Sequence, residues 1–351
     1  MVVSTLVPVG VFLVGVALVV WSVEEFVEHV AEAAVNLGVS TFLLTVVLAG
    51  TDLENAVLGI AAAAGDLPDV ALGTVFGEAL FVLGAAVGLA GLAVPFEEST
   101  PREYLALTAL SPALLALLSA DGRLSRLDGG VLLVAFAPLL WAVYRLESSR
   151  STRFLEAEDA EELEAETTGE RSGGGDGRDA DAIDAADTSD AAEGDWDENE
   201  DGDERELADI GLVVLAVVGM TAGSQLAVSG ARDLLAAFDL VGLAFGATVM
   251  SFIASLEELL LTVEPIREGR PAVGIGNVVG SVLFFVTANA GAIALVRPLD
   301  LTTAVFAVHW PFFLGALALV VAFLVRGSVG RAEGALLLAV YAGYWAANYL
   351  R

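Results

Sequence analysis

Two segments of this 351-residue chain carry the same residue pattern 203 positions apart. Without any gap, Leu53-Glu54 falls on Leu256-Glu257. The other matched pairs are glycines, phenylalanines and a proline: Phe42 with Phe245, Gly73 with Gly276, Gly77 with Gly280, Phe81 with Phe284, and Pro95 with Pro298. Shared apolar composition would match Leu and Ala at scattered positions, not these types in one register over about 50 residues. The sequence therefore predicts two related halves.

The chain is strongly apolar and strongly acidic at once. It is 56% hydrophobic, with a mean hydropathy of +0.73, yet its formal net charge is −31. Position resolves the conflict, because residues 147–206 hold roughly half of the 47 carboxylates and the rest is mostly apolar runs of a length that spans a bilayer, ~20 residues. We predict an all-α integral membrane protein of the cell membrane, crossing it several times, with an acidic insert.

The apolar runs predict ten transmembrane helices. A first half, 1–146, contains five, and a second half, 207–351, contains five more. Because an odd number of crossings separates the two copies, the second enters the membrane from the opposite side, which is an inverted repeat. The predicted spans are about 3–23, 36–64, 68–94, 103–120, 129–146, 207–229, 234–265, 272–296, 301–325 and 331–350.

The acidic segment 147–206 is predicted to be a disordered linker, because it is too polar to bury a core. A solvated tail is favoured over a calcium-sensing loop, since no ordered Asp-x-Asp-x-Asp-Gly pattern is present. Arginine is modestly more frequent on the linker side of the predicted spans, which places the linker in the cytoplasm and both termini outside.

All basic residues are arginine, and there is no cysteine. Acidic excess without lysine is typical of proteins adapted to high salt and predicts a haloarchaeal source. The alternative is a high-GC genome that prefers arginine, with the acid concentrated in one linker. Without cysteine, neither a disulfide nor a thiolate metal site can form.

Five acids lie inside the apolar segments: Asp52, Glu54, Glu78, Glu257 and Glu258. A carboxylate at the centre of a membrane helix costs roughly 2.5–3.5 kcal/mol on insertion scales, so these acids should face a wet or cation-filled cavity. Hard cations such as Ca²⁺ bind several oxygen ligands. Neutral oxygens are available close by, at Thr51, Asn55, Ser255 and Ser281.

These segments resemble the two α-repeats of the calcium/cation antiporter superfamily, which includes the sodium/calcium exchangers. The family pattern is roughly G-T-S-L-P-E, followed 19 residues after its Glu by the Asn of G-N-x-x-G-S-N-x-F-N. Here Asn55 and Thr74, and likewise Glu258 and Asn277, stand at that spacing. The run from Gly276 to Ser281 is a close match, whereas the first copy is degenerate.

The chain departs from the family pattern where the ion would bind. The family's Glu becomes Asn55 in the first copy and remains Glu258 in the second. Acid appears instead at Asp52 and Glu78, and the final polar positions become Val82 and Phe285. The resemblance implies a cation site lined by Thr51, Asp52, Asn55, Glu78, Ser255, Glu258 and Ser281.

Glu54 and Glu257 replace the family's helix-breaking prolines. One residue along a helix is a turn of about 100°, so these two acids are expected to face another helix or a side pocket. They are either a second cation or proton site, or buried acids that are protonated or paired. Both alternatives stay open.

The resemblance implies a secondary active antiporter, not an enzyme, that exchanges Ca²⁺ against Na⁺ by alternating access. Crowded carboxylates make protons natural competitors for the metal, so an H⁺/cation antiporter is one alternative. A cation-binding membrane protein that no longer transports is another. Membrane lipid and inorganic cations (Ca²⁺, Na⁺ or H⁺) are the expected partners, with no cofactor and no nucleic acid. His29, among acids at a membrane edge, is interpreted as part of a solvated face, and His309 as a packing residue.

Overall fold

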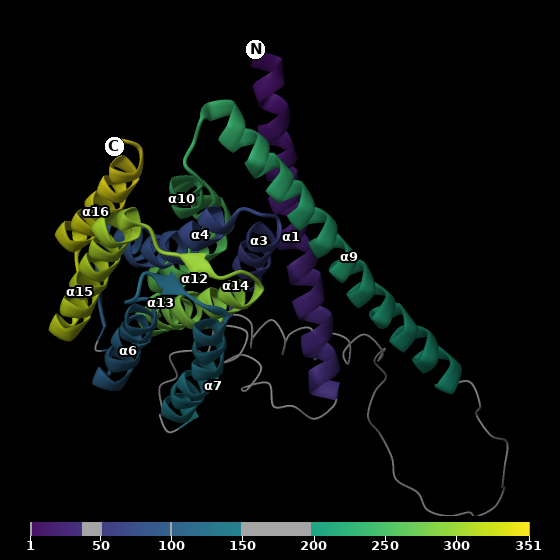
Figure 1. The fold of residues 1–351 in the computed structure, drawn as a ribbon. Coiled ribbons are helices and arrows are strands. Elements are labelled where there is room, and N and C mark those ends of the chain that lie inside the picture. Colours follow the sequence, from purple (N-terminus) through teal and green to yellow (C-terminus); the bar gives the residue numbers. More distant parts are fainter. Residues whose placement is uncertain (1, 37–50, 99, 149–197, 351) are drawn as a thin grey trace, which may run out of the picture.

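In the computed structural model, the described residues are 2–36, 51–98, 100–148 and 198–350. Two long helices, α1 (Val2–Asn36) and α9 (Glu198–Phe238), lie side by side and cross beside the rest of the molecule (Figure 1). Each is the first helix of its half. Their contact is close because small residues face each other: a Cβ on Gly223 would lie 2.9 Å from the Gly15 carbonyl oxygen.

The centre of the molecule is built from the segments that repeat. In the first half these are α3 (Leu53–Ala64) and α4 (Pro68–Leu80), with α4 continuing through the π-helical η1 (Phe81–Ala86) into α5 (Val87–Ala93). In the second half, α10 (Gly242–Phe245), η3 (Gly246–Met250) and α11 (Ser251–Ala254) lead to α12 (Leu256–Arg267). The last central segments are α13 (Pro271–Phe284), η4 (Phe285–Asn289) and α14 (Ala290–Val296).

The backbone repeats at the same shift as the sequence. Proline opens both α4 and α13, at Pro68 and Pro271, where its missing N–H costs nothing. A left-handed residue precedes each of them, Asp66 (φ 60°) and Gly269 (φ 80°). Both helices then widen into a π-helical stretch, η1 or η4, at corresponding positions. The matched residues therefore specify matched local structure.

Short strands join the two halves. β1 (Phe96–Glu97) pairs antiparallel with β4 (Ser328–Val329), and β2 (Arg123–Leu124) pairs antiparallel with β3 (Leu299–Asp300). In both pairs one strand comes from each half. The remaining helices flank the centre: α6 (Arg102–Leu118), α7 (Arg126–Ser148), η5 (Val305–His309), α15 (Trp310–Arg326) and α16 (Arg331–Tyr349) (Figure 1).

Among the described residues, six helices are long and apolar enough to cross a membrane, or seven if a bent pair counts as one span. That pair is Gly242–Ala254 with Leu256–Arg267, bent by 51°. The six are Leu6–Val30, Pro68–Ala93, Arg126–Leu146, Gly211–Phe238, Pro271–Val296 and Val305–Arg326. The predicted spans at 103–120 and 331–350 coincide with α6 and α16, and the described part of the span at 36–64 is the 12-residue α3.

Two predicted boundaries in the second half are wrong. α9 begins at Glu198, so residues 198–206 are helical and not linker, and it continues to Phe238, past the break predicted between 229 and 234. Hydropathy marks where the apolar residues begin, whereas a helix can extend beyond its apolar span. The predicted disorder of 149–197 lies outside the described residues.

The central helices cross at very short range. A Cβ on Gly73 would lie 2.6 Å from the backbone nitrogen of Ala247, and one on Gly77 would lie 2.5 Å from the carbonyl oxygen of the same residue. Both neighbours are backbone atoms of η3 and cannot move aside like a side chain. The small residues at 73 and 77 therefore let α4 contact η3 directly.

Gly73→Ala should destabilise the protein by about 1–3 kcal/mol, because overpacking forces the two backbones apart. The matched control is Gly315→Ala on α15, where a Cβ meets nothing within 4 Å. The unfolding temperatures of the two detergent-solubilised variants are compared, with size-exclusion chromatography after heating used to measure the folded fraction. Equal unfolding temperatures for the two variants would contradict this close packing.

Candidate cation site

Both copies of the motif lie where a helix begins or breaks. Asp52, in an extended conformation (φ −91°, ψ 92°), caps α3, and its Oδ1 accepts the backbone N–H of Asn55 at 2.9 Å. In the second copy the helix breaks at Ser255 (φ −97°, ψ 18°), between α11 and α12. The acids Glu54, Glu257 and Glu258 stand in the first turns of α3 and α12, where the helix dipole favours negative charge.

Glu258 is a buried carboxylate held by two donors from α13. Its Oε2 accepts the amide of Asn277 at 2.6 Å and the hydroxyl of Ser281 at 2.9 Å. The side chain is only 6% exposed. Hydrogen bonds of this kind fix the direction of an ionised carboxylate without neutralising it.

Asn55 joins the two copies. Its amide nitrogen donates to Asp52 Oδ2 at 2.5 Å and to Ser255 Oγ, in the other half, at 3.3 Å. Asp52 also interacts electrostatically with Glu258. The start of α3 and the break before α12 therefore face each other, with two carboxylates and two neutral polar side chains between them.

Glu78 contributes a third carboxylate, from α4. It is 1% exposed, and its Oε2 accepts the amide of Asn289, in η4, at 2.8 Å. Glu78 interacts electrostatically with both Asp52 and Glu258. Asn289 is the residue that the sequence analysis missed, because at the repeat shift it falls on Ala86 and has no polar counterpart. In the sequence, the available signal was an amide side chain within an apolar run, and the structure shows that this amide is fully buried.

The structure thus brings together five of the seven predicted site residues, Asp52, Asn55, Ser255, Glu258 and Ser281, and places the sixth, Glu78, within electrostatic range of them. The seventh, Thr51, is half-buried directly before Asp52. Within the described part of the chain, no arginine forms an ion pair with Asp52, Glu78 or Glu258. Buried charges require a partner, and among the described residues that partner is not a basic side chain.

Glu54 and Glu257 lie together beside this cluster. They interact with each other electrostatically, and Glu54 also interacts with Asp52. Glu54 is half-buried and Glu257 is exposed. Glu257 is therefore not packed in the protein core.

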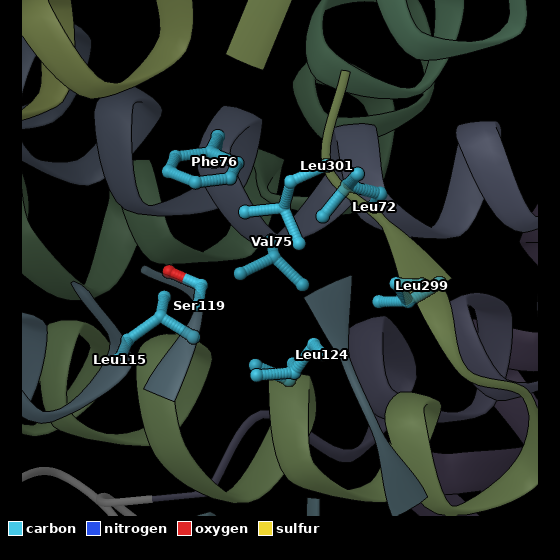
Figure 2. Close-up of a pocket in the computed structure, with 9 residues that line it drawn as sticks. Leu72, Val75, Phe76, Leu115, Ser119, Leu124, Leu299 and Leu301 are labelled. Carbon is cyan, nitrogen blue, oxygen red and sulfur yellow. The ribbon is translucent and has the colours of Figure 1, made fainter. Parts of the chain in front are cut away.

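Two other features lie elsewhere. On α1, Glu25, Glu28 and His29 have ligand atoms within 4.8 Å of one another, but all three are on a single helix, and Glu28 is exposed. The pocket of Figure 2 is apolar apart from Ser119 and so is no cation site. It lies between α4, α6, α14 and the β2–β3 pair, with Leu72, Val75, Leu115, Leu124 and Leu299 among its lining residues.

Comparison with known proteins identifies the family. The chain matches the family described as sodium/calcium exchanger protein over residues 7–145 and 209–350, which is most of its length. It belongs to the sodium/calcium exchanger family. The exchanger is therefore a multi-pass membrane protein and a cation transporter, not an enzyme, as the sequence resemblance implied.

Relatives match this exchanger along nearly the whole chain. CaxA of Alkalimonas amylolytica is 27% identical over 343 residues, covering 95% of each chain. Inner membrane protein YrbG of Escherichia coli (strain K12) is 25% identical over 295 residues, covering 82% of this chain and 80% of YrbG. A solved structure of the sodium-calcium exchanger NCX_Mj matches with a TM-score of 0.56 and 22% identity, over 100% of both chains, so the two share a fold.

Asn277→Leu should weaken Ca²⁺ binding by about 10–100-fold, as is typical when a group that orients a metal ligand is lost. The variant removes the 2.6 Å donor to Glu258 while keeping a side chain of similar size. Equilibrium binding of ⁴⁵Ca²⁺ to the purified exchanger measures the change. Thr221→Val on α9, which removes an exposed hydroxyl bonded only to its own helix, is the control and should bind as the unmodified protein does.

Proposed function

We propose that this exchanger moves Ca²⁺ against Na⁺ by alternating access, with the divalent cation held between Asp52 and Glu258. The observation that carries the proposal is that these two carboxylates, Asp52 half-buried and Glu258 buried, come from facing helix starts in opposite halves and have no arginine partner among the described residues. A divalent cation matches the charge of two carboxylates. Ser255 and Asn55 stand between them and supply neutral oxygens.

The exchange cycle follows from the way the halves are divided. We propose two inverted five-helix halves, 1–146 and 207–351, joined by a cytoplasmic linker. Residues from both halves contact the same site, so a displacement of one half against the other moves its ligands apart. Asn55 and Ser255 are only 3.3 Å apart across this division. The same motion would open the site to one side of the membrane and close it to the other.

Proton coupling is the second candidate, and two observations favour it. Asp52 and Glu258 interact electrostatically, and two neighbouring carboxylates can share a proton in place of a metal. The family's final polar positions are occupied by Val82 and Phe285, both fully buried, so two expected Na⁺ ligands are missing. A role without transport has less support. Continuous helices through both motifs, with the two glutamates packed in the core, would favour it. Instead, α3 begins at Leu53, α12 begins after a break, and Glu257 is exposed.

Uptake of ⁴⁵Ca²⁺ into proteoliposomes, under separately imposed Na⁺ and pH gradients, distinguishes these candidates. We expect uptake driven by Na⁺ inside the vesicles and reduced by Glu258→Gln to the level of protein-free vesicles. Glu264→Gln is the matched control, because Glu264 is an exposed acid on the same helix, paired with Arg267, and should transport normally. Uptake driven by the pH gradient alone would show that H⁺, and not Na⁺, is the coupling ion. Absence of uptake under both gradients would contradict Ca²⁺ exchange.

A further inference from the structure

Glu78 and Asn289 form a pair that the internal repeat does not explain. At the repeat shift, Glu78 corresponds to Ser281, and Asn289 corresponds to Ala86. In the second half the carboxylate is on α12, at Glu258, and its donors are on α13. In the first half the equivalent of Glu258 is the amide Asn55, and the carboxylate stands on α4 instead, with its donor supplied by η4 of the other half. The two halves thus place their acids on different helices.

Two amide oxygens in this region are buried without a hydrogen-bond donor. They are Oδ1 of Asn55 and Oδ1 of Asn289, and both side chains are 0% exposed. The nitrogens of the same amides are engaged, with Asp52 and Glu78 respectively. An unpaired buried carbonyl oxygen is costly and needs an explanation, and a bound cation supplies one.

Asn289 of η4 lies against the helix that carries Asn55, α3. A Cβ placed on Gly59 would be 3.4 Å from Asn289 Oδ1, so this oxygen lies against α3 at Gly59. Gly59 is four residues after Asn55, and residues at that spacing share a helix face. The unpaired oxygen of Asn289 is therefore one turn from Asn55, whose own oxygen is also unpaired, and the carboxylate of Glu78 is bonded to the same amide group.

We propose that Asn289 is a cation ligand, and that it forms, with Glu78 and Asn55, a binding position for a singly charged cation such as Na⁺. This inference rests on the proposed exchange function, and it adds a position distinct from the one between Asp52 and Glu258. One carboxylate with two neutral amide oxygens balances one positive charge, whereas the two carboxylates of the first position balance two.

The test measures ²²Na⁺ and ⁴⁵Ca²⁺ binding separately on the purified full chain. Asn289→Leu, which keeps the size but removes both polar atoms, should weaken Na⁺ binding about tenfold or more, the range typical of altered metal ligation. Ca²⁺ affinity measured without Na⁺ should stay within about twofold, since Glu258 and its donors are unchanged. Asn348→Leu is the matched control, because Asn348 is bonded only to the Tyr344 carbonyl on α16, and should alter neither affinity.

Two results would overturn the proposal: unchanged Na⁺ binding in Asn289→Leu, or equal losses of Na⁺ and Ca²⁺ binding, which would make Asn289 part of a single common site. If Asn289→Leu fails to fold, Asn289→Ser gives the same comparison with a smaller side chain. Failure of the exchange function is separately visible as absence of Ca²⁺ binding to the unmodified protein. If the unmodified protein binds Ca²⁺ but no Na⁺, the proposal of a Ca²⁺ site stands and the proposed Na⁺ position at Asn289 is refuted.

Discussion

Three carboxylates without a basic partner among the described residues, two of them buried and one half-buried, govern the organisation of this exchanger. Asp52, Glu78 and Glu258 interact with one another electrostatically, and the hydrogen bonds described for them come from neutral groups. Amide and hydroxyl donors orient a carboxylate but leave its charge in place. In an apolar protein that charge is tolerable only beside a cation or a proton. We therefore expect ion binding to stabilise the folded state as well as to serve transport.

The helix starts around the site meet this electrostatic requirement in part. Asp52 caps α3, and Glu258 lies in the first turn of α12. The helix dipole favours an acid at each of these positions, which lowers the cost of burying it. Close packing then brings the acids together, because the glycines of α4 let that helix contact η3 directly. The helix starts and the glycines of α4 therefore both determine where the acids lie.

The repeated residues allowed much of the fold to be predicted, and some of the site. Pro68 and Pro271, at matched positions, each open a helix, and the register that aligned Glu54 with Glu257 recurs in the backbone. Site residues with a counterpart in the other copy or in the family motif were predicted. Asn289 was missed because it has no such counterpart, and its role depends on a contact 211 positions away in the chain. The start of α9 was misplaced because composition marks where apolar residues begin, not where helical hydrogen bonds do.

The most direct test of the central claim is a crystal structure of the exchanger grown with Sr²⁺ in place of Ca²⁺ and analysed by anomalous scattering. The account predicts an anomalous peak between the carboxylates of Asp52 and Glu258, within coordinating distance of both, about 2.3–2.6 Å for Ca²⁺ and slightly longer for Sr²⁺. A peak only at Glu25, Glu28 and His29 on α1, or a site between Asp52 and Glu258 without Sr²⁺ at saturating concentration, would contradict it.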